Sequence, residues 1–173
     1  MTISLYDISI ASSLQVVGAV QHFLAKGKAH CEENGIDLNE VVETRLFPDM
    51  LPFRFQIVSV AHHSLGSIKG VESGEFGPPG ALGDLNYTDL QKLISDTLSG
   101  LQAYTPEAVN AHEGGDVVFK IGERAIPFVA EQFVMSFSHP NIYFHAATAY
   151  DILRMKGVPL GKRDFMGAMR MKS

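Results

Sequence analysis

The side chains best suited to chemistry in this sequence are histidines that fall within predicted helices. His145 lies in a helix expected over about residues 139–156, and on a helical wheel it shares the inward face with Ile142 and Ile152. A buried polar group that lacks a hydrogen-bond partner costs roughly 1–3 kcal/mol. We therefore expect His145 to contact a metal ion, a carboxylate, a backbone carbonyl or a water molecule.

The expected counterpart of His145 is His62, in the second predicted helix. On a helical wheel His62 lies at the edge of the apolar face, whereas His63 points away, beside Gln56. Helical bundles build metal sites from side chains on facing helices. A typical catalytic zinc site uses three protein ligands, one more than this pair provides. The pattern therefore favours hydrogen-bonded histidines, with metal ligation and acid–base catalysis as alternatives.

Other polar side chains share the helix of His145. Asn141 lies one turn before His145 on the same edge, and Tyr143 begins a separate polar streak. We expect Asn141, Tyr143 and His145 to line a pocket, together with Gln56 from the second helix. A small molecule is the ligand that such a pocket would take.

A basic pair, Lys162 and Arg163, follows the turn after this helix. The pair could bind an anion, but a solvated loop tip is the commoner role of two adjacent basic residues, and we favour it. Asp164 could hold Arg163 or Arg154 in place through an ion pair.

Four helices would position these side chains. They are expected over about residues 5–33, 45–69, 88–104 and 139–156. Apolar residues recur in them at helical spacing, and Thr88 with Gln91 has the pattern of a capping box. The fourth helix has three stop signals, because Lys156 complements the helix dipole, Gly157 favours a left-handed cap and Pro159 forbids continuation.

The connecting segments differ in character. Residues 38–44 suggest a short helix, and residues 71–86 are so rich in glycine and proline that we expect an irregular connector. Residues 116–128 contain two apolar runs around a glycine-centred break, which predicts a small β-hairpin packed on the helices. Residues 129–137 suggest a further short helical segment.

Composition limits the class of protein. A chain of 173 residues fits a single domain, 1–173, and a net charge of -5 without a dense basic block argues against nucleic-acid binding. The lone cysteine, Cys31, fits a reducing compartment. We see neither a secretory signal nor an apolar run of roughly 18 residues, so we expect a cytoplasmic protein without membrane contact.

The charged fraction points to extensive burial. Charged residues make up 19% of the chain, below the quarter or so that is typical of soluble domains. A large core, an oligomer interface or both would explain this shortage. The sequence also lacks the hydrolase G-x-S-x-G, phosphate-loop, H-E-x-x-H and C-x-x-C motifs.

Several stretches together resemble an uncharacterised family, a domain of unknown function found in bacteria and fungi. These stretches are PNIYFH at 140–145, TAYDILR at 148–154, GVPLGKRDF at 157–165, and RLFPDM at 45–50 followed by Gln56. The resemblance covers nearly the whole chain. That family is grouped with the DinB/YfiT-like metalloenzymes, so the resemblance implies an all-α four-helix bundle with long crossover connections, often dimeric.

The resemblance also bears on the site. Metal-binding DinB-like proteins, some of them thiol transferases or isomerases, place one histidine on the second helix and an H-x-x-x-H pair on the last. His145 matches the second histidine of that pair, but Asn141 stands at the first position. His62 or His63 would match the second-helix histidine, and the wheel favours His62. His139 could reach the site from before the helix.

Three functional hypotheses follow. The first is an enzyme-like pocket around His62 and His145 that holds a divalent metal such as zinc or nickel. The second is a non-catalytic, small-molecule-binding or interaction homodimer that has lost the metal set, and the third is a purely structural role for His145. Because one of three expected ligands is missing, we favour the absence of any cofactor.

Overall fold

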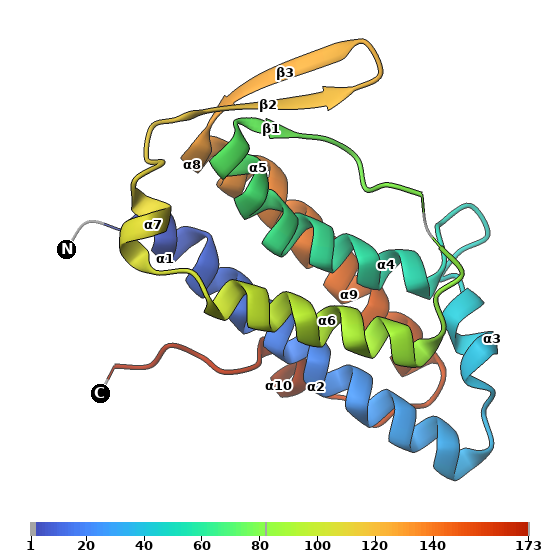
Figure 1. Cartoon of the computed structure of the whole chain (residues 1–173). Helices are drawn as coiled ribbons and strands as arrows, with labels where there is room; N and C mark the ends of the chain where they lie inside the picture. Colours follow the sequence, from blue (N-terminus) through green and yellow to red (C-terminus); the bar gives the residue numbers. More distant parts are fainter. Residues whose placement is uncertain (1–2, 82, 173) are drawn as a thin grey trace.

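The protein is mostly helical, with a small three-stranded sheet on one side (Figure 1). The computed structural model describes residues 3–81 and 83–172. The α-helices are α1 (Leu5–Ile8), α2 (Ile10–Asn34), α3 (Leu38–Glu43), α4 (Phe53–Ala61), α5 (Ser67–Ser73), α6 (Tyr87–Gln102), α7 (Pro106–Asn110), α8 (Ala130–Phe133), α9 (His139–Met155) and α10 (Lys162–Met166). Two π-helical turns, η1 (His62–Gly66) and η2 (Val134–Ser138), and the strands β1 (Glu75–Phe76), β2 (Asp116–Ile121) and β3 (Arg124–Val129) complete the described elements.

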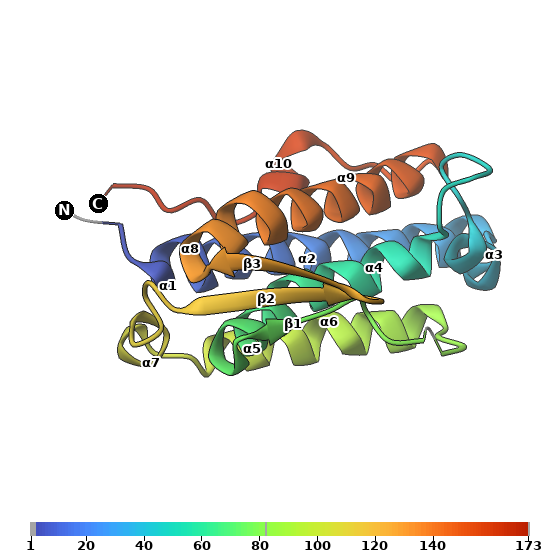
Figure 2. The ribbon, with the colours of Figure 1, turned by 90° about the horizontal axis from the view of Figure 1, so that it is seen from above.

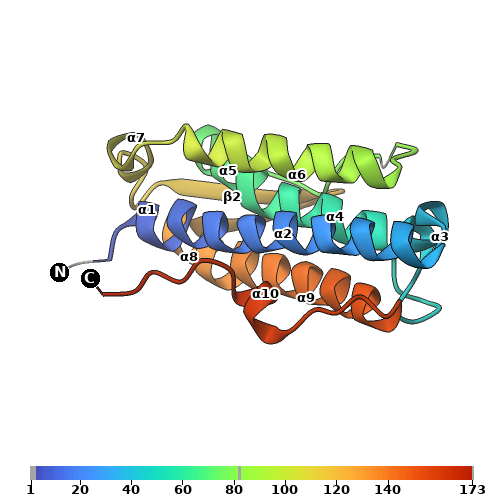
Figure 3. The same ribbon diagram turned by 90° about the horizontal axis from the view of Figure 1, so that it is seen from below.

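The long helices α2, α4, α6 and α9 lie side by side (Figures 1 and 3), and each contributes buried apolar side chains to the core. α2 contacts α6 and α9, and α4 contacts the same two helices, so each long helix has two neighbours. The core is built from large apolar side chains that are essentially inaccessible to solvent. Its fully buried members include Phe23, Leu24, Phe53, Ile57, Leu90, Ile94, Leu101 and Phe133. In all three views the first and the last described residues lie at the same end of the helical body.

The first long helix follows the predicted bounds except for a break near its start. Ser9 separates α1 from α2, and its hydroxyl donates to the Leu5 carbonyl oxygen at 2.5 Å. The most apolar stretch within Leu5–Asn34 has a mean hydropathy of 1.4, enough to cross a membrane by length and composition. The expectation that no apolar segment is long enough to span a membrane is therefore wrong for this helix. Half of the stretch is buried in the protein.

Two glycines of α2 should respond oppositely to substitution by alanine. A Cβ atom at Gly27 would lie 2.5 Å from the Tyr87 hydroxyl and 3.1 Å from the Leu153 methyl groups, whereas one at Gly18 would meet no atom within 4 Å. We expect Gly27→Ala to destabilise the protein by about 1–3 kcal/mol through overpacking. Gly18→Ala should stabilise it by up to about 1 kcal/mol through helix propensity. Urea unfolding of both variants checks this pair, and equal effects would contradict it.

The prediction that the second long helix opens at residues 45–50 is wrong. Helix α4 begins at Phe53, and residues 45–52 form a loop in which the Arg45 guanidinium donates to the Met50 carbonyl oxygen at 2.5 Å. Pro52 explains the later start, because proline suits a helix start and keeps the residue before it out of the helical conformation. The helical path then continues through η1 and α5 to Ser73. Within η1 the Ser64 hydroxyl donates to the Val60 carbonyl oxygen, a hydrogen bond that favours a local bend.

The last long helix is also continuous with the segment before it. α8, η2 and α9 follow one another without a break, so the predicted short helix at 129–137 and the fourth helix form one rod. Pro140 lacks a backbone N–H, and the Asn141 side-chain amide donates to the Phe137 carbonyl oxygen at 2.7 Å. The predicted end of this helix is confirmed, because Lys156 is its C-cap and Gly157 has a φ of 88°.

The sheet contains the predicted hairpin and one strand that the sequence did not predict. β2 and β3 pair antiparallel from Asp116 opposite Val129 to Ile121 opposite Arg124. β1 pairs parallel with β2, and Phe76 lies opposite Phe119. The order is β1-β2-β3, and seen from above the sheet extends over the region between α5 and α8 (Figure 2).

The capping box of helix α6 lies two residues before the predicted one. Asn86 is its N-cap and Asp89 completes the box, in place of Thr88 and Gln91. The Asn86 amide oxygen accepts from the Asp89 backbone N–H at 3.0 Å, and the Asp89 carboxylate accepts from the Asn86 backbone N–H at 3.0 Å. The predicted helix is therefore present, and its first residue is Tyr87.

Candidate functional site

His145 is held in one tautomer by a chain of hydrogen bonds. Gln56 donates from Nε2 to the Leu51 carbonyl oxygen at 2.8 Å, which requires the amide nitrogen to face the loop. The amide oxygen of Gln56 therefore faces His145 and lies 2.7 Å from Nδ1. An amide oxygen only accepts, so Nδ1 of His145 carries the proton and Nε2 presents a lone pair.

The histidine that faces His145 is His63, so the choice of His62 is wrong. The rings of His63 and His145 lie 6.0 Å apart between centroids and are inclined by 11°. The side chain of His63 is buried, and its Nδ1 has no hydrogen-bond partner among the described residues. His62 instead turns toward β1, where Nε2 donates to the Gly77 carbonyl oxygen at 2.8 Å and the ring stacks on Phe76.

The wheel failed at this point because α4 is covered from two sides. Helix α4 contacts both α6 and α9, and polar residues lie on the path of α4 and η1 at Gln56, Ser59 and His63, of which Gln56 and His63 face His145 of α9. All three are buried despite their polarity. A criterion that selects the most apolar face as the interior therefore rejects the face on which the polar site lies.

Aromatic side chains fill the space around the two histidines. Phe55 and Phe144 meet the His145 ring edge-on, with centroid distances of 5.7 and 5.3 Å. Phe76 and Phe137 each lie 5.7 Å from His63. Both π-helical turns adjoin this cluster, since His63 belongs to η1 and Phe137 to η2. Such turns often occur at functional sites because they change the direction of individual side chains.

Burial keeps both histidines neutral. Desolvation lowers the pKa of His63 to about 3, with repulsion from His62 and His145 as smaller causes. Desolvation also lowers the pKa of His145 to about 4. At neutral pH the site therefore presents uncharged imidazoles, the protonation state in which histidine accepts a hydrogen bond or binds a metal.

The remaining predicted site residues are distributed around this cluster. The Asn141 amide nitrogen is used by the Phe137 carbonyl oxygen, so this side chain supports its own helix. Tyr143 is 44% exposed, and its ring lies 5.8 Å from that of His139. Tyr143 therefore faces away from the pocket expected for it. His139 has a buried Nε2 without a partner among the described residues, and burial lowers its pKa.

The donor set does not fit a catalytic zinc centre. His63 and His145 supply two nitrogen lone pairs, and within residues 3–81 and 83–172 no third histidine, cysteine or carboxylate completes a metal-binding group with them. Catalytic zinc sites use three protein ligands and an open position. The arrangement offers two of the three protein ligands of such a site, and Gln56 would serve as the orienting partner of one of them.

Replacing Gln56 with leucine tests the assigned tautomer. The variant removes the acceptor of His145 Nδ1–H, and an unsatisfied buried donor costs about 1–3 kcal/mol of unfolding free energy. Chemical denaturation measures that loss, and ¹⁵N NMR of the imidazoles should show the Nδ1–H tautomer of His145 in the unmodified protein only. Gln102→Leu, on the exposed end of α6, is the matched control and should change stability by less than about 0.5 kcal/mol. An Nε2–H tautomer of His145 would contradict the assignment.

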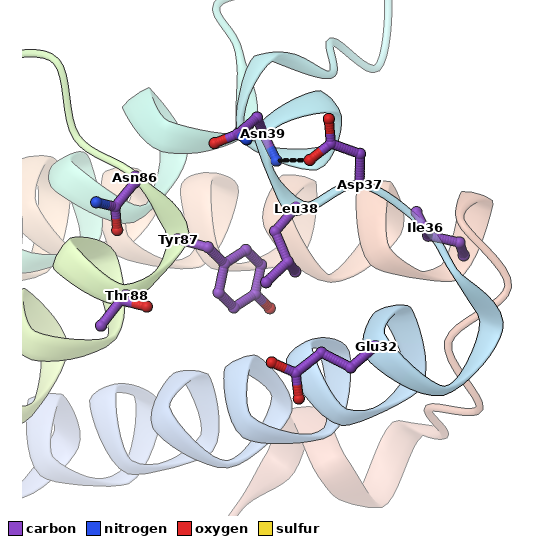
Figure 4. Close-up of a pocket in the computed structure, with 8 residues that line it drawn as sticks. All are labelled: Glu32, Ile36, Asp37, Leu38, Asn39, Asn86, Tyr87 and Thr88. Atoms are coloured by element: carbon purple, nitrogen blue, oxygen red, sulfur yellow. Dashed lines mark hydrogen bonds between the residues drawn. The ribbon is translucent and has the colours of Figure 1, made fainter.

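A separate cleft of about 510 Å³ lies where α2 ends and α3 and α6 begin (Figure 4). Glu32, Asn39 and Thr88 point toward it from three elements, and the Tyr87 ring lies behind it. Two of its polar groups serve the helices themselves, since Asp37 accepts from the Asn39 backbone N–H at 2.9 Å and Asn86 caps α6. Its carboxylates attract cations while the helix N-termini attract anions, so this cleft has no consistent charge preference.

The basic pair opens α10, where Lys162 and Arg163 are both exposed. Asp164 pairs with neither Arg163 nor Arg154, because its carboxylate binds Lys26 at 3.0 Å and His22 at 2.9 Å. Backbone and side-chain hydrogen bonds, led by the Gly161 N–H, lower the pKa of Asp164 to about 2. Asp164 thereby fastens α10 to α2.

One comparison with known proteins identifies the family, and another identifies the fold. A family model described as "Domain of unknown function (DUF1993)" matches residues 5–166. Among solved structures, the crystal structure of a DinB family member from Shewanella denitrificans superposes with a TM-score of 0.80 at 21% sequence identity. The match covers 98% of this chain and 95% of that chain, and at this identity it shows the fold alone. No protein of curated function matches the chain.

Proposed function

The chain belongs to the DUF1993 family, and on this premise we propose that it is a cytoplasmic, DinB-like four-helix bundle that binds a small organic molecule without catalysing a reaction. The long helices α2, α4, α6 and α9 would form the bundle. His145 is only partly buried, but Phe55, Phe144 and Gln56 contact its ring, and this crowding is the observation that carries the non-catalytic part of the proposal.

Catalysis at His145 would need space for a substrate beside the histidine. The five characterised clefts of the described residues are lined by neither His63 nor His145. Phe55, Phe144 and Gln56 already contact His145 from different directions. The same helices carry open clefts elsewhere on their surface, and we assign ligand binding to that surface.

The metal content of the purified protein tests the non-catalytic part. Protein prepared without a histidine tag should contain much less than one zinc or nickel ion per chain, and added Zn²⁺ or Ni²⁺ should leave its melting temperature unchanged. A stoichiometric metal, together with hydrolysis or group transfer that is lost in His145→Gln, would overturn the proposal.

A second candidate function is a bound divalent metal, either zinc or nickel, on His63 and His145. Two observations favour it. The buried Nδ1 of His63 lacks a partner among the described residues. Gln56 accepts from Nδ1–H of His145, so the lone pair of this ring lies on Nε2. When bound, such an ion would supply Lewis-acid chemistry. A melting temperature that rises with added Zn²⁺ in the unmodified protein but not in His63→Leu would establish this candidate.

We also propose that the protein is a homodimer. The low charged fraction of 19% supports an additional covered surface, and several large apolar side chains on α9 and the hairpin are exposed. They include Ile126 at 44%, Phe144 at 57% and Met155 at 55% exposure. Light scattering during size-exclusion chromatography should give twice the mass of 18.9 kDa, and a monomeric mass would refute this part.

A further inference from the structure

A cleft of about 330 Å³ opens on the side of α4 that contacts α6 rather than α9. Val58 and Leu65 form one wall, Leu93 of α6 contributes the other, and the glycine- and proline-rich connector closes the rim at Pro79. This volume falls at the lower end of the range typical of small-molecule sites, and mostly apolar walls are typical of such sites too.

Two polar side chains give the cleft its chemistry. His62 donates from Nε2 to the Gly77 carbonyl oxygen at 2.8 Å, so Nδ1 of the neutral ring is left as an acceptor. Stacking on Phe76, with 4.5 Å between ring centroids, fixes the plane of the imidazole. Lys69 is the charged member of the lining, and within the described part of the chain no carboxylate lies within ion-pair distance of its ammonium.

The charge and shape of this cleft define a ligand class. We propose that the cleft binds a small organic acid with an apolar body, whose carboxylate pairs with Lys69 and whose hydroxyl donates to His62 Nδ1. The body of the ligand would pack on Val58, Leu65 and Leu93. His62 and Lys69 are seven residues apart on one helical path, which corresponds to roughly 10 Å. Because the Lys69 side chain is long and flexible, a ligand with a hydroxyl and a carboxylate at opposite ends of an aromatic ring can reach both groups over this backbone spacing.

This assignment rests on the proposed small-molecule function and gives it a location. The cleft near α3 is a poorer candidate because its capping side chains and mixed charges disfavour one ligand type. The cleft at α4 and α6 instead has one uncompensated cation over an apolar floor, which favours a monoanion over a cation or a neutral sugar.

The test is an NMR titration of the full chain with 4-hydroxyphenylacetate. Saturable shifts are expected at the amides of Leu65, Lys69 and Leu93. Phenylacetate, which lacks the hydroxyl, should bind several-fold more weakly, and tyramine, which carries an ammonium in place of the carboxylate, should not bind. Lys69→Met should weaken binding about tenfold, whereas Lys172→Met makes the same charge change in the C-terminal tail and should have no effect.

A second variant tests the contact with the imidazole. His62→Phe keeps a ring for stacking on Phe76 but removes Nδ1, so it should abolish the preference for 4-hydroxyphenylacetate over phenylacetate. Absence of shifts at this cleft, or equal binding in Lys69→Met, would overturn the inference. Saturable binding of these acids at a different cleft would refute this location while leaving the proposed function intact, because that function requires a bound small molecule but not this particular cleft.

Discussion

Replacing Phe76 with alanine is expected to lower the free energy of unfolding by about 3–5 kcal/mol, as is typical of buried phenylalanines. Phe76 is only 7% exposed, although it belongs to a strand of two residues. Its ring stacks on His62 and lies 5.2 Å from the ring of Phe133 and 5.7 Å from that of His63. Removing this ring would leave a cavity between η1, η2 and the sheet.

The backbone around Phe76 makes collapse of that cavity difficult. A Cβ atom at Gly70 would lie 2.9 Å from the Phe76 ring, so α5 already approaches the ring as closely as its backbone permits. Guanidinium unfolding measures the loss. Phe144→Ala is the matched control, because Phe144 is 57% exposed and its truncation should cost less than about 1 kcal/mol. Similar losses in both variants would show that Phe76 is not part of the core.

The second large effect concerns pH. His63 and His145 have pKa values of about 3 and about 4 in the folded protein, below the ordinary value of 6.5. The unfolded chain therefore binds more protons than the folded chain, so the stability from these groups is complete above about pH 6.5 and is lost as the pH falls toward 4 and 3. Between pH 7 and pH 5 the free energy of unfolding should fall by about 2–4 kcal/mol after allowance for solvent screening at His145.

A variant separates these histidines from other titrating groups. Burial also lowers the pKa values of His62 and His139, so they add to the same trend. His63→Leu should remove a large share of the loss between pH 7 and pH 5 and should be more stable than the unmodified protein at pH 5. Gln102→Leu, which replaces no titratable group, is the control and should keep the full pH dependence. Urea midpoints at constant ionic strength provide the measurement, and an unchanged slope in His63→Leu would exclude His63 as a source.

Local signals predicted much of the helical architecture. Capping and stop residues such as Gly157 act within one or two turns, so the end of α9 could be derived from neighbouring residues alone. The hairpin β2–β3 was predicted for the same reason, because its two strands are separated by a short turn. The start of α4 was misplaced where two prolines, Pro48 and Pro52, competed as possible first-turn residues.

The missed features depend on contacts between distant residues. β1 consists of two residues among glycines, and it exists because Phe76 pairs with Phe119 and packs on η1. No local pattern near residue 76 contains that information. The orientation of His63 likewise depends on α9 covering the polar face of α4. Asn141, at the position where metal-binding relatives have a histidine, has a structural role because its amide donates to the Phe137 carbonyl oxygen. This role could not be predicted because it depends on the backbone conformation of η2.

Pro127 in β3 affects how the protein can meet other chains. β3 is the outer strand of the sheet, and it displays apolar side chains such as Ile126 and Val129 to solvent. A free edge of this kind is a template for intermolecular strand addition and aggregation. Proline is tolerated in a ladder where its nitrogen points away from the partner strand, so Pro127 removes a donor from the outer edge. The hairpin can thereby present an apolar surface while its outer edge resists pairing with another strand.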